Sequence, residues 1–161
     1  MTFRIVTMIF AILLFVPAPS IAQNMEESEK LFFEAFSICA TNFPDRKATS
    51  KAAKASGFRF ENASGITKVY SGNKRRFMVV IGKNQCGFII DKLSESRAVA
   101  ISAIAGKKNL KNLIRIKKPA EKGTVAEWSG TTNNTAITLG VSKIRKAGWL
   151  KGAVIVLLLR E

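Results

Sequence analysis

Apolar residues recur every three or four positions directly after residue 23, up to about residue 42. Between residues 25 and 42 they form one wide stripe at helical spacing, made of Leu31, Phe32, Ala35, Phe36, Ile38 and Cys39. Asn24 and Glu27 stand three residues apart before this stripe, as the two partners of a capping box do. The pattern predicts a helix over 25–42 whose apolar face packs against a core.

A second helix is expected directly after the first, from residue 46 to about residue 56. Pro44-Asp45 ends the first helix and begins the second, and Gly57 supplies a C-terminal stop. One stripe of this segment contains Ala48, Ala52 and Ala55, and the opposite stripe contains Lys47, Lys51 and Lys54. We expect the alanines to face inward and to let this helix lie close to a neighbour.

The pattern then changes to short runs rich in β-branched and aromatic residues, bounded by Gly, Asn and Ser. Strands are expected at 57–61, 65–71, 75–82 and 86–91, and again at 112–118, 123–130, 135–144 and 151–160. Between the two sets, Ser94 is placed to cap a third helix, which is almost wholly apolar after Arg97 and should be buried. Gly106 is expected to end that helix, and Asn133-Asn134 to form a tight turn.

The order of these elements indicates the fold class. Two helices precede the strands and only one is interleaved, which argues against parallel βαβ units. We therefore predict an α+β fold, with a mainly antiparallel sheet, two N-terminal helices and one buried interleaved helix on one face. A helix that ends in glycine precedes several short strands twice, which suggests a weak internal duplication.

The first 22 residues have the order of a secretory signal peptide. Arg4 precedes an apolar run from Ile5 to Val16, and Ser20 and Ala22 put small residues at −3 and −1 of a cut before Gln23. The alternative is a membrane anchor, but a run of about twelve apolar residues is short of the roughly twenty that a spanning helix needs. We expect a mature chain, 23–161, that forms one periplasmic or secreted domain without a transmembrane helix.

The chain has two cysteines, Cys39 and Cys86. In an oxidising compartment an even pair suggests one disulfide, and two buried free thiols are the main alternative. A nucleophilic cysteine usually needs a base such as histidine, which this chain lacks. Zinc sites use three or four protein ligands, more than two cysteines supply. We therefore expect a Cys39–Cys86 disulfide, with no metal site and no cofactor.

The chain carries 26 Lys and Arg against 11 Asp and Glu, a formal net charge of +15. Loss of Arg4 with the signal peptide leaves 25 − 11 = +14, and such an excess attracts anions. Folding could gather several of these cations at one edge of the sheet. The candidates for an anion-binding face are Lys74, Arg75, Arg76, Lys107, Lys108, Lys117, Lys118, Arg145 and Lys146, with Trp149 in a basic, glycine-flanked loop.

Export, together with the lack of an interleaved aromatic-basic pattern, argues against nucleic acid as the partner of these cations. The expected partner is an anionic envelope component (lipid, lipopolysaccharide or polysaccharide) or an acidic protein. Two alternatives stay open: the charge could be incidental to a structural secreted domain, and Trp149 could fold back onto the core. No oligomeric state is predicted.

Catalytic chemistry is poorly represented in the sequence. There is no histidine, no G-x-S-x-G, no P-loop and no S-x-x-K motif. Asp91, Glu61 and Glu127 are the strand-associated acids that could serve a small carboxylate-based hydrolase, which would need two of them in one cleft. We therefore expect a non-enzymatic binding or accessory protein.

The stretch CATNFPDRKATSKAAKASGF, followed by CGF at Cys86, resembles a family of small uncharacterised exported proteins of Gram-negative bacteria. In that family a helix cysteine precedes an alanine-rich helix that ends in Gly-Phe, and a Cys-Gly begins a later strand. The resemblance covers residues 36–90. It implies export and a paired cysteine, and it assigns no activity and no functional residue.

Overall fold

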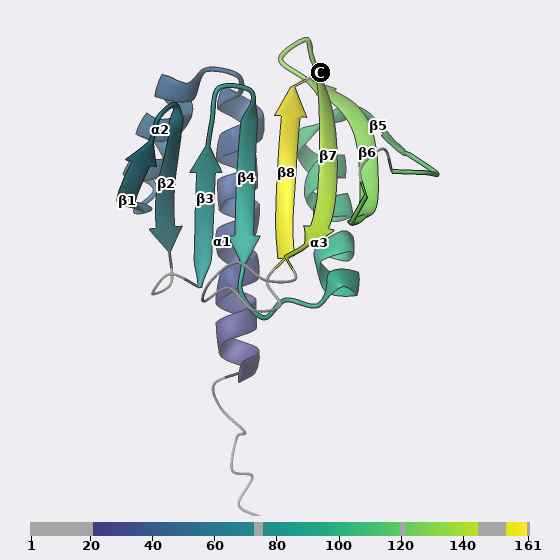
Figure 1. Cartoon of the computed structure of the whole chain (residues 1–161), viewed down its shortest axis with the longest axis horizontal. Helices are drawn as coiled ribbons and strands as arrows, with labels where there is room; N and C mark the ends of the chain where they lie inside the picture. Colours follow the sequence, from purple (N-terminus) through teal and green to yellow (C-terminus); the bar gives the residue numbers. More distant parts are fainter. Residues whose placement is uncertain (1–20, 73–75, 120–121, 145–153, 161) are drawn as a thin grey trace, which may run out of the picture.

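A computed structural model describes residues 21–72, 76–119, 122–144 and 154–160 (Figure 1). The elements in these ranges are α1 (Ile21–Asn42), α2 (Arg46–Ala55), β1 (Arg59–Ser64), β2 (Thr67–Gly72), β3 (Phe77–Ile81), β4 (Gln85–Ile90), α3 (Glu95–Asn109), β5 (Lys111–Arg115), β6 (Thr124–Thr132), β7 (Thr135–Lys143) and β8 (Val154–Arg160). Helix α1 begins two residues before the cleavage point predicted at Gln23. The rest of the predicted signal peptide lies outside the described ranges.

The eight described strands form one antiparallel sheet in the order β1-β2-β3-β4-β8-β7-β6-β5. Strands β1 to β4 make one meander and β5 to β8 make a second, and their last strands, β4 and β8, pair at the centre of the sheet. Helices α1 and α2 precede the first meander and α3 precedes the second, so α2 has no counterpart in the second half. The predicted α+β class, with two N-terminal helices and one interleaved helix, is confirmed.

The helices lie on one face of the sheet, with α1 behind the first meander and α3 behind the second (Figure 1). Phe88 of β4 packs against Phe32 and Phe36 of α1, and Gly106 of α3 lies against Leu139 of β7. Alternate residues of a strand point to opposite faces. We call the face that contains Phe88 and Leu139 the helix-covered face and the opposite one the open face.

Local sequence explains why several elements begin and turn where they do. Asp45 caps α2, because its carboxylate accepts hydrogen bonds from the backbone N–H groups of Lys47 and Ala48. Ser94 caps α3 as predicted. Asn133 and Asn134 both adopt positive φ, 47° and 58°, which the two-residue turn between β6 and β7 requires. These three predictions are confirmed.

Two local predictions are wrong. Asn24 lies inside α1 and not at its N-terminus, because the helix begins at Ile21. In α2 the alanine stripe is not the buried one, since the buried residues are Thr49, Ser50 and Ala53. This buried set is rotated around the helix by about one position, and the lysines opposite it are exposed as expected.

The prediction that Gly106 ends the third helix is also wrong. Helix α3 continues to Asn109, and Gly106 is buried within its last turns. A Cβ built at Gly106 would lie 2.9 Å from Leu113 Cδ2 and 3.1 Å from Leu139 Cδ2. The glycine is therefore needed for close packing of α3 on β5 and β7, and not for a left-handed helix stop.

Replacing Gly106 with valine is expected to lower the free energy of unfolding by about 1–3 kcal/mol, because the side chain overpacks the contact between α3 and the sheet. The measurement is urea denaturation followed by circular dichroism. Ala100→Val is the control: Ala100 is exposed on the same helix, so only the lower helix propensity of valine, about 0.6 kcal/mol, should be seen. Equal losses in the two variants would contradict a packing role for Gly106.

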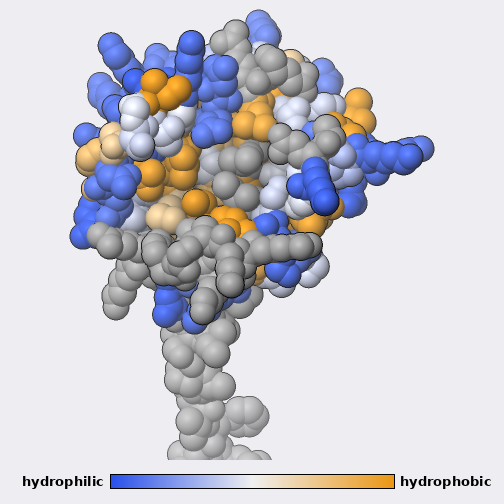
Figure 2. All heavy atoms as spheres, in the orientation of Figure 1, coloured by the Kyte–Doolittle hydropathy of each residue, from blue (hydrophilic) through white to orange (hydrophobic). Residues whose placement is uncertain are grey.

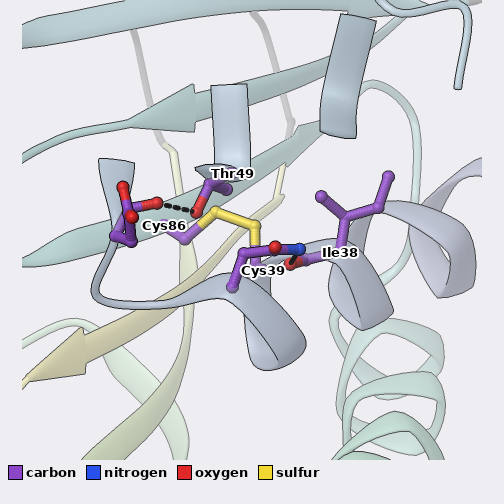
Figure 3. Close-up of a disulfide and its surroundings, with 6 residues drawn as sticks. Ile38, Cys39, Thr49 and Cys86 are labelled. Atoms are coloured by element: carbon purple, nitrogen blue, oxygen red, sulfur yellow. Dashed lines mark hydrogen bonds between the residues drawn. A yellow bond between two sulfur atoms is a disulfide. The ribbon is translucent and has the colours of Figure 1, made fainter. Parts of the chain in front are cut away.

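A disulfide joins Cys39, near the end of α1, to Cys86 in β4 (Figure 3). Both cysteines are fully buried, and their Cα atoms are 6.1 Å apart. Thr49 of α2 lies beside the bond, where its hydroxyl donates to the Asp45 carbonyl oxygen at 2.7 Å. The predicted pairing is present, and it attaches the last turn of α1 to a central strand of the sheet.

Candidate anion-binding site

The segment from the end of β5 to the start of β6 is one of the basic segments of the described chain. It carries Arg115 at the end of β5, followed by Lys117, Lys118 and Lys122. All four side chains are exposed. We call these four residues the basic hairpin. Because β5 is an edge strand, the hairpin stands at the margin of the sheet.

Pairing of β5 with β6 positions Arg115. Arg115 stands opposite Trp128 in the ladder, and the backbone N–H of Ile116 donates to the Glu127 carbonyl oxygen at 2.9 Å, which extends the pairing past the end of β5. The Arg115 guanidinium lies over the Trp128 ring, 5.8 Å from the ring centroid. This cation–π contact restricts the side chain without neutralising its charge.

A hollow of about 450 Å³ opens beside the hairpin. Its lining consists of Arg115, Ile116, Lys117, Pro119, Val125 and Ala126. Its volume is within the range of about 300–1,000 Å³ that is typical of small-molecule sites. Two cations next to aliphatic side chains suit a ligand with an anionic group and an adjoining apolar part.

Three other cations of the described chain are paired with carboxylates. The ion pairs are Arg59–Glu61 at 2.8 Å, Arg97–Glu29 at 2.6 Å and Lys143–Glu95 at 2.7 Å. The hydrogen bonds to Glu29 and the charge of that carboxylate raise the pKa of Arg97. Within the described ranges no ion pair involves a residue of the basic hairpin.

The structure brings together only part of the predicted anion-binding set. Lys117 and Lys118 lie in the basic hairpin. Arg76 precedes β3, five strand spacings from β5, or about 24 Å across the sheet. Lys107 and Lys108 lie in the last turn of α3, which leads into the opposite end of β5. Lys74, Arg75, Arg145, Lys146 and Trp149 lie outside the described residues.

The positions of Lys107 and Lys108 at the end of α3 have a structural explanation. Cations in the last turn of a helix interact favourably with its C-terminal carbonyl groups, and both lysines occupy that turn of α3. Arg115 and Lys122, in contrast, were not among the predicted residues. Their closeness in sequence to Lys117 and Lys118 was visible, but the stacking of Arg115 on Trp128 depends on strand pairing.

The three acids considered for a hydrolase lie on, or directly after, three different strands. Glu61 is in β1 and Glu127 is in β6, six strand spacings apart, or about 29 Å. Asp91 follows β4, three spacings from β6, or about 14 Å. Glycosidase carboxylates stand at most about 9.5 Å apart. Glu61 also accepts hydrogen bonds from Ser71 and Arg59, which fits a structural role at the sheet edge.

Within the described ranges, no group of three or more Cys, Asp or Glu side chains is placed to hold a metal ion. In the same ranges, no helix is long and apolar enough to cross a bilayer. No family model matches the chain, and neither a curated protein nor a solved structure is similar to it.

Proposed function

We propose that this chain is an exported, non-enzymatic binding protein whose basic hairpin binds the anionic groups of a cell-envelope component. The observation that carries the proposal is the hollow beside Arg115 and Lys117, where two cations adjoin aliphatic side chains. Phospholipid and lipopolysaccharide combine phosphate with acyl chains, so they match this lining better than a purely polar anion does.

Electrostatics support the same ligand class. The hairpin concentrates four cations that no carboxylate of the described chain neutralises. A Lys or Arg close to an anionic lipid surface contributes about 1 kcal/mol of attraction, and salt screens this contribution. Affinity that falls with ionic strength is therefore the expected signature of the site.

Export is the second part of the proposal. The first 22 residues have the composition of a signal peptide. The buried Cys39–Cys86 disulfide is of the kind that persists in oxidising compartments. A periplasmic or secreted protein would meet anionic envelope components directly.

The test is binding of the purified, disulfide-bonded protein to vesicles that contain phosphatidylglycerol, measured by co-sedimentation. The double variant Lys117→Gln/Lys118→Gln is expected to bind about 30-fold more weakly, because two surface lysines lose about 2 kcal/mol of attraction. Binding of the unmodified protein should weaken steeply as salt rises from about 0.05 M to about 0.5 M.

The matched control is Lys107→Gln/Lys108→Gln, which removes the same charge from the other end of β5. Its affinity should stay within about threefold of the unmodified protein, since screening limits the reach of charges more than about 10 Å away. If both double variants lose affinity equally, the charge acts as a whole and the hairpin is not a site. If the unmodified protein binds neither vesicles nor lipopolysaccharide at low salt, the charge is incidental.

A further inference from the structure

The centre of the open face, over β2, β3, β4, β8 and β7, has no charged residue at its register positions. Two rows of residues cross this face from β2 to β7: Ser71, Met78, Ile89, Ile155 and Ser142 in one, and Val69, Val80, Gly87, Leu157 and Gly140 in the next. A third row adds Gln85, Leu159 and Thr138. None of these register positions holds Lys, Arg, Asp or Glu, in a chain with 26 cations and 11 anions.

The charged residues of these five strands occupy the helix-covered face instead. Lys68 pairs with Ile81, Lys143 pairs with Val154, and Arg160 pairs with Ile137, all in rows of that face. The charged positions of the open face lie towards its margins, with Arg59 in β1 and Glu127 in β6. Figure 2 shows this distribution, with apolar and neutral surface near the middle of the face and hydrophilic side chains around it.

The apolar side chains on this face are only partly buried. Val69, Met78, Val80, Ile89 and Leu159 are all partly exposed, and the helices lie on the opposite side. Antiparallel sheets with one solvated face normally place polar residues there. A flat apolar surface with a polar rim is typical of an interface.

Gly140 gives independent support for another surface that packs on this face. It stands in the middle of β7, where glycine weakens a strand, and it has no positive φ that would require glycine. Among the described residues, the nearest side-chain atom to a Cβ built there is Thr124 Cγ2, at 4.0 Å. The described residues therefore leave room for a side chain at this position, and a glycine there suits the close approach of another surface.

Both edges of the sheet disfavour association by strand addition. β1 has a bulge between Phe60 and Asn62, and β5 has one between Lys111 and Ile114. Bulges and cations on edge strands prevent pairing with another sheet. An occupant of the open face must therefore stack on it and not extend the sheet.

We infer that the open face binds a second copy of this chain, so that two sheets stack face to face about a two-fold axis. The centre of the face has no cation to recognise an anionic ligand, and a neutral surface of the same kind complements it. Two stacked sheets of identical chains form a self-complementary contact, the commonest symmetry of soluble oligomers.

The uncharged centre of the face is large enough for a weak, reversible contact. Its five strands, about 4.8 Å apart and with at least five residues each at about 3.3 Å, cover about 400 Å² of flat surface per copy. A standard stable interface buries about 800 Å² of accessible surface per partner, so a micromolar dimer and not a tighter one is expected.

Charge repulsion between copies gives this inference a signature of its own. If the signal peptide is removed, each copy carries 25 − 11 = +14, and the cations surround the contact without entering it. Salt screens like-charge repulsion, so dimerisation should strengthen as salt rises from about 0.05 M to about 0.5 M. Anion binding by the basic hairpin weakens over the same range, so either idea can fail without the other.

Sedimentation equilibrium of the purified, disulfide-bonded protein tests the inference. The unmodified protein is expected to show a monomer–dimer equilibrium in the micromolar range, and Val80→Glu should raise the dimer dissociation constant by at least about tenfold. Ile104→Glu is the control, because Ile104 is 56% exposed on α3, away from the open face. If circular dichroism shows that Val80→Glu does not fold, Met78→Lys takes its place. Met78 lies two residues before Val80 in β3, on the same face of the sheet.

Three outcomes would overturn the inference. The unmodified protein could stay monomeric at high salt and high micromolar concentration. The dimer could persist unchanged in a folded Val80→Glu or Met78→Lys variant. Finally, a monomer that binds phosphatidylglycerol vesicles and loses that binding on Val80→Glu would show that the face meets lipid.

Discussion

Replacing Phe88 with alanine is expected to lower the free energy of unfolding by about 3–5 kcal/mol, the usual cost of removing a buried Phe side chain. Phe88 is 0% exposed in β4. Its ring lies 5.4 Å from that of Phe32 in an edge-to-face arrangement, and it stacks on Phe36 at 5.8 Å and on Phe77 at 6.4 Å. The substitution therefore removes the ring that links α1 to β3 and β4.

Guanidinium chloride denaturation, followed by circular dichroism, measures this loss. Phe60→Ala is the matched control: Phe60 is 45% exposed in β1 and contacts Tyr70 and Lys54. Its truncation should cost about 1 kcal/mol, the value of an aromatic pair near the surface. A loss at Phe88 no greater than at Phe60 would show that the aromatic cluster is not the main support of the core.

Removing the disulfide should produce a loss of similar size. In the chain-entropy model, cross-linking residues separated by 47 positions restricts the unfolded chain by about 4 kcal/mol. Cys39→Ala/Cys86→Ala is therefore expected to lower the stability by about that amount. Because α1 and β4 are also held by the aromatic cluster, we expect the variant to fold at low temperature.

Reductant provides the control for the disulfide. The unmodified protein should lose about 4 kcal/mol of stability when dithiothreitol is added, whereas the double variant should not respond. If reduction leaves the denaturation midpoint unchanged, the bond contributes little to stability.

Much of the fold could be predicted because its signals are local. The capping serine of α3 and the paired asparagines of the β6–β7 turn act within a few residues, so they could be read from the sequence. The glycine at position 106 illustrates the limit of local reading. A glycine near the end of a helix usually marks a stop, but here the approach of Leu113 and Leu139 decides the residue type.

The candidate site was harder to predict for the same reason. Lys117 and Lys118 form a cluster in sequence and remain one in space, but the position of Arg115 over Trp128 depends on pairing between β5 and β6. The charge-free centre of the open face depends on the register of the sheet, since each of its strands also carries residues for the other face. Sequence alone indicated a basic protein, and strand order decides where its cations lie.

The position of β8 has a consequence for how this chain is made. The strand comes from residues 154–160, yet it lies between β4 and β7 and joins the two meanders. A chain that is made from its N-terminus can form the first meander early, but it can neither complete the second meander nor join the two until residues 154–160 are present. Truncation before residue 154 would divide the sheet through its middle, so proteolytic trimming of the tail should abolish folding and not merely loosen an end.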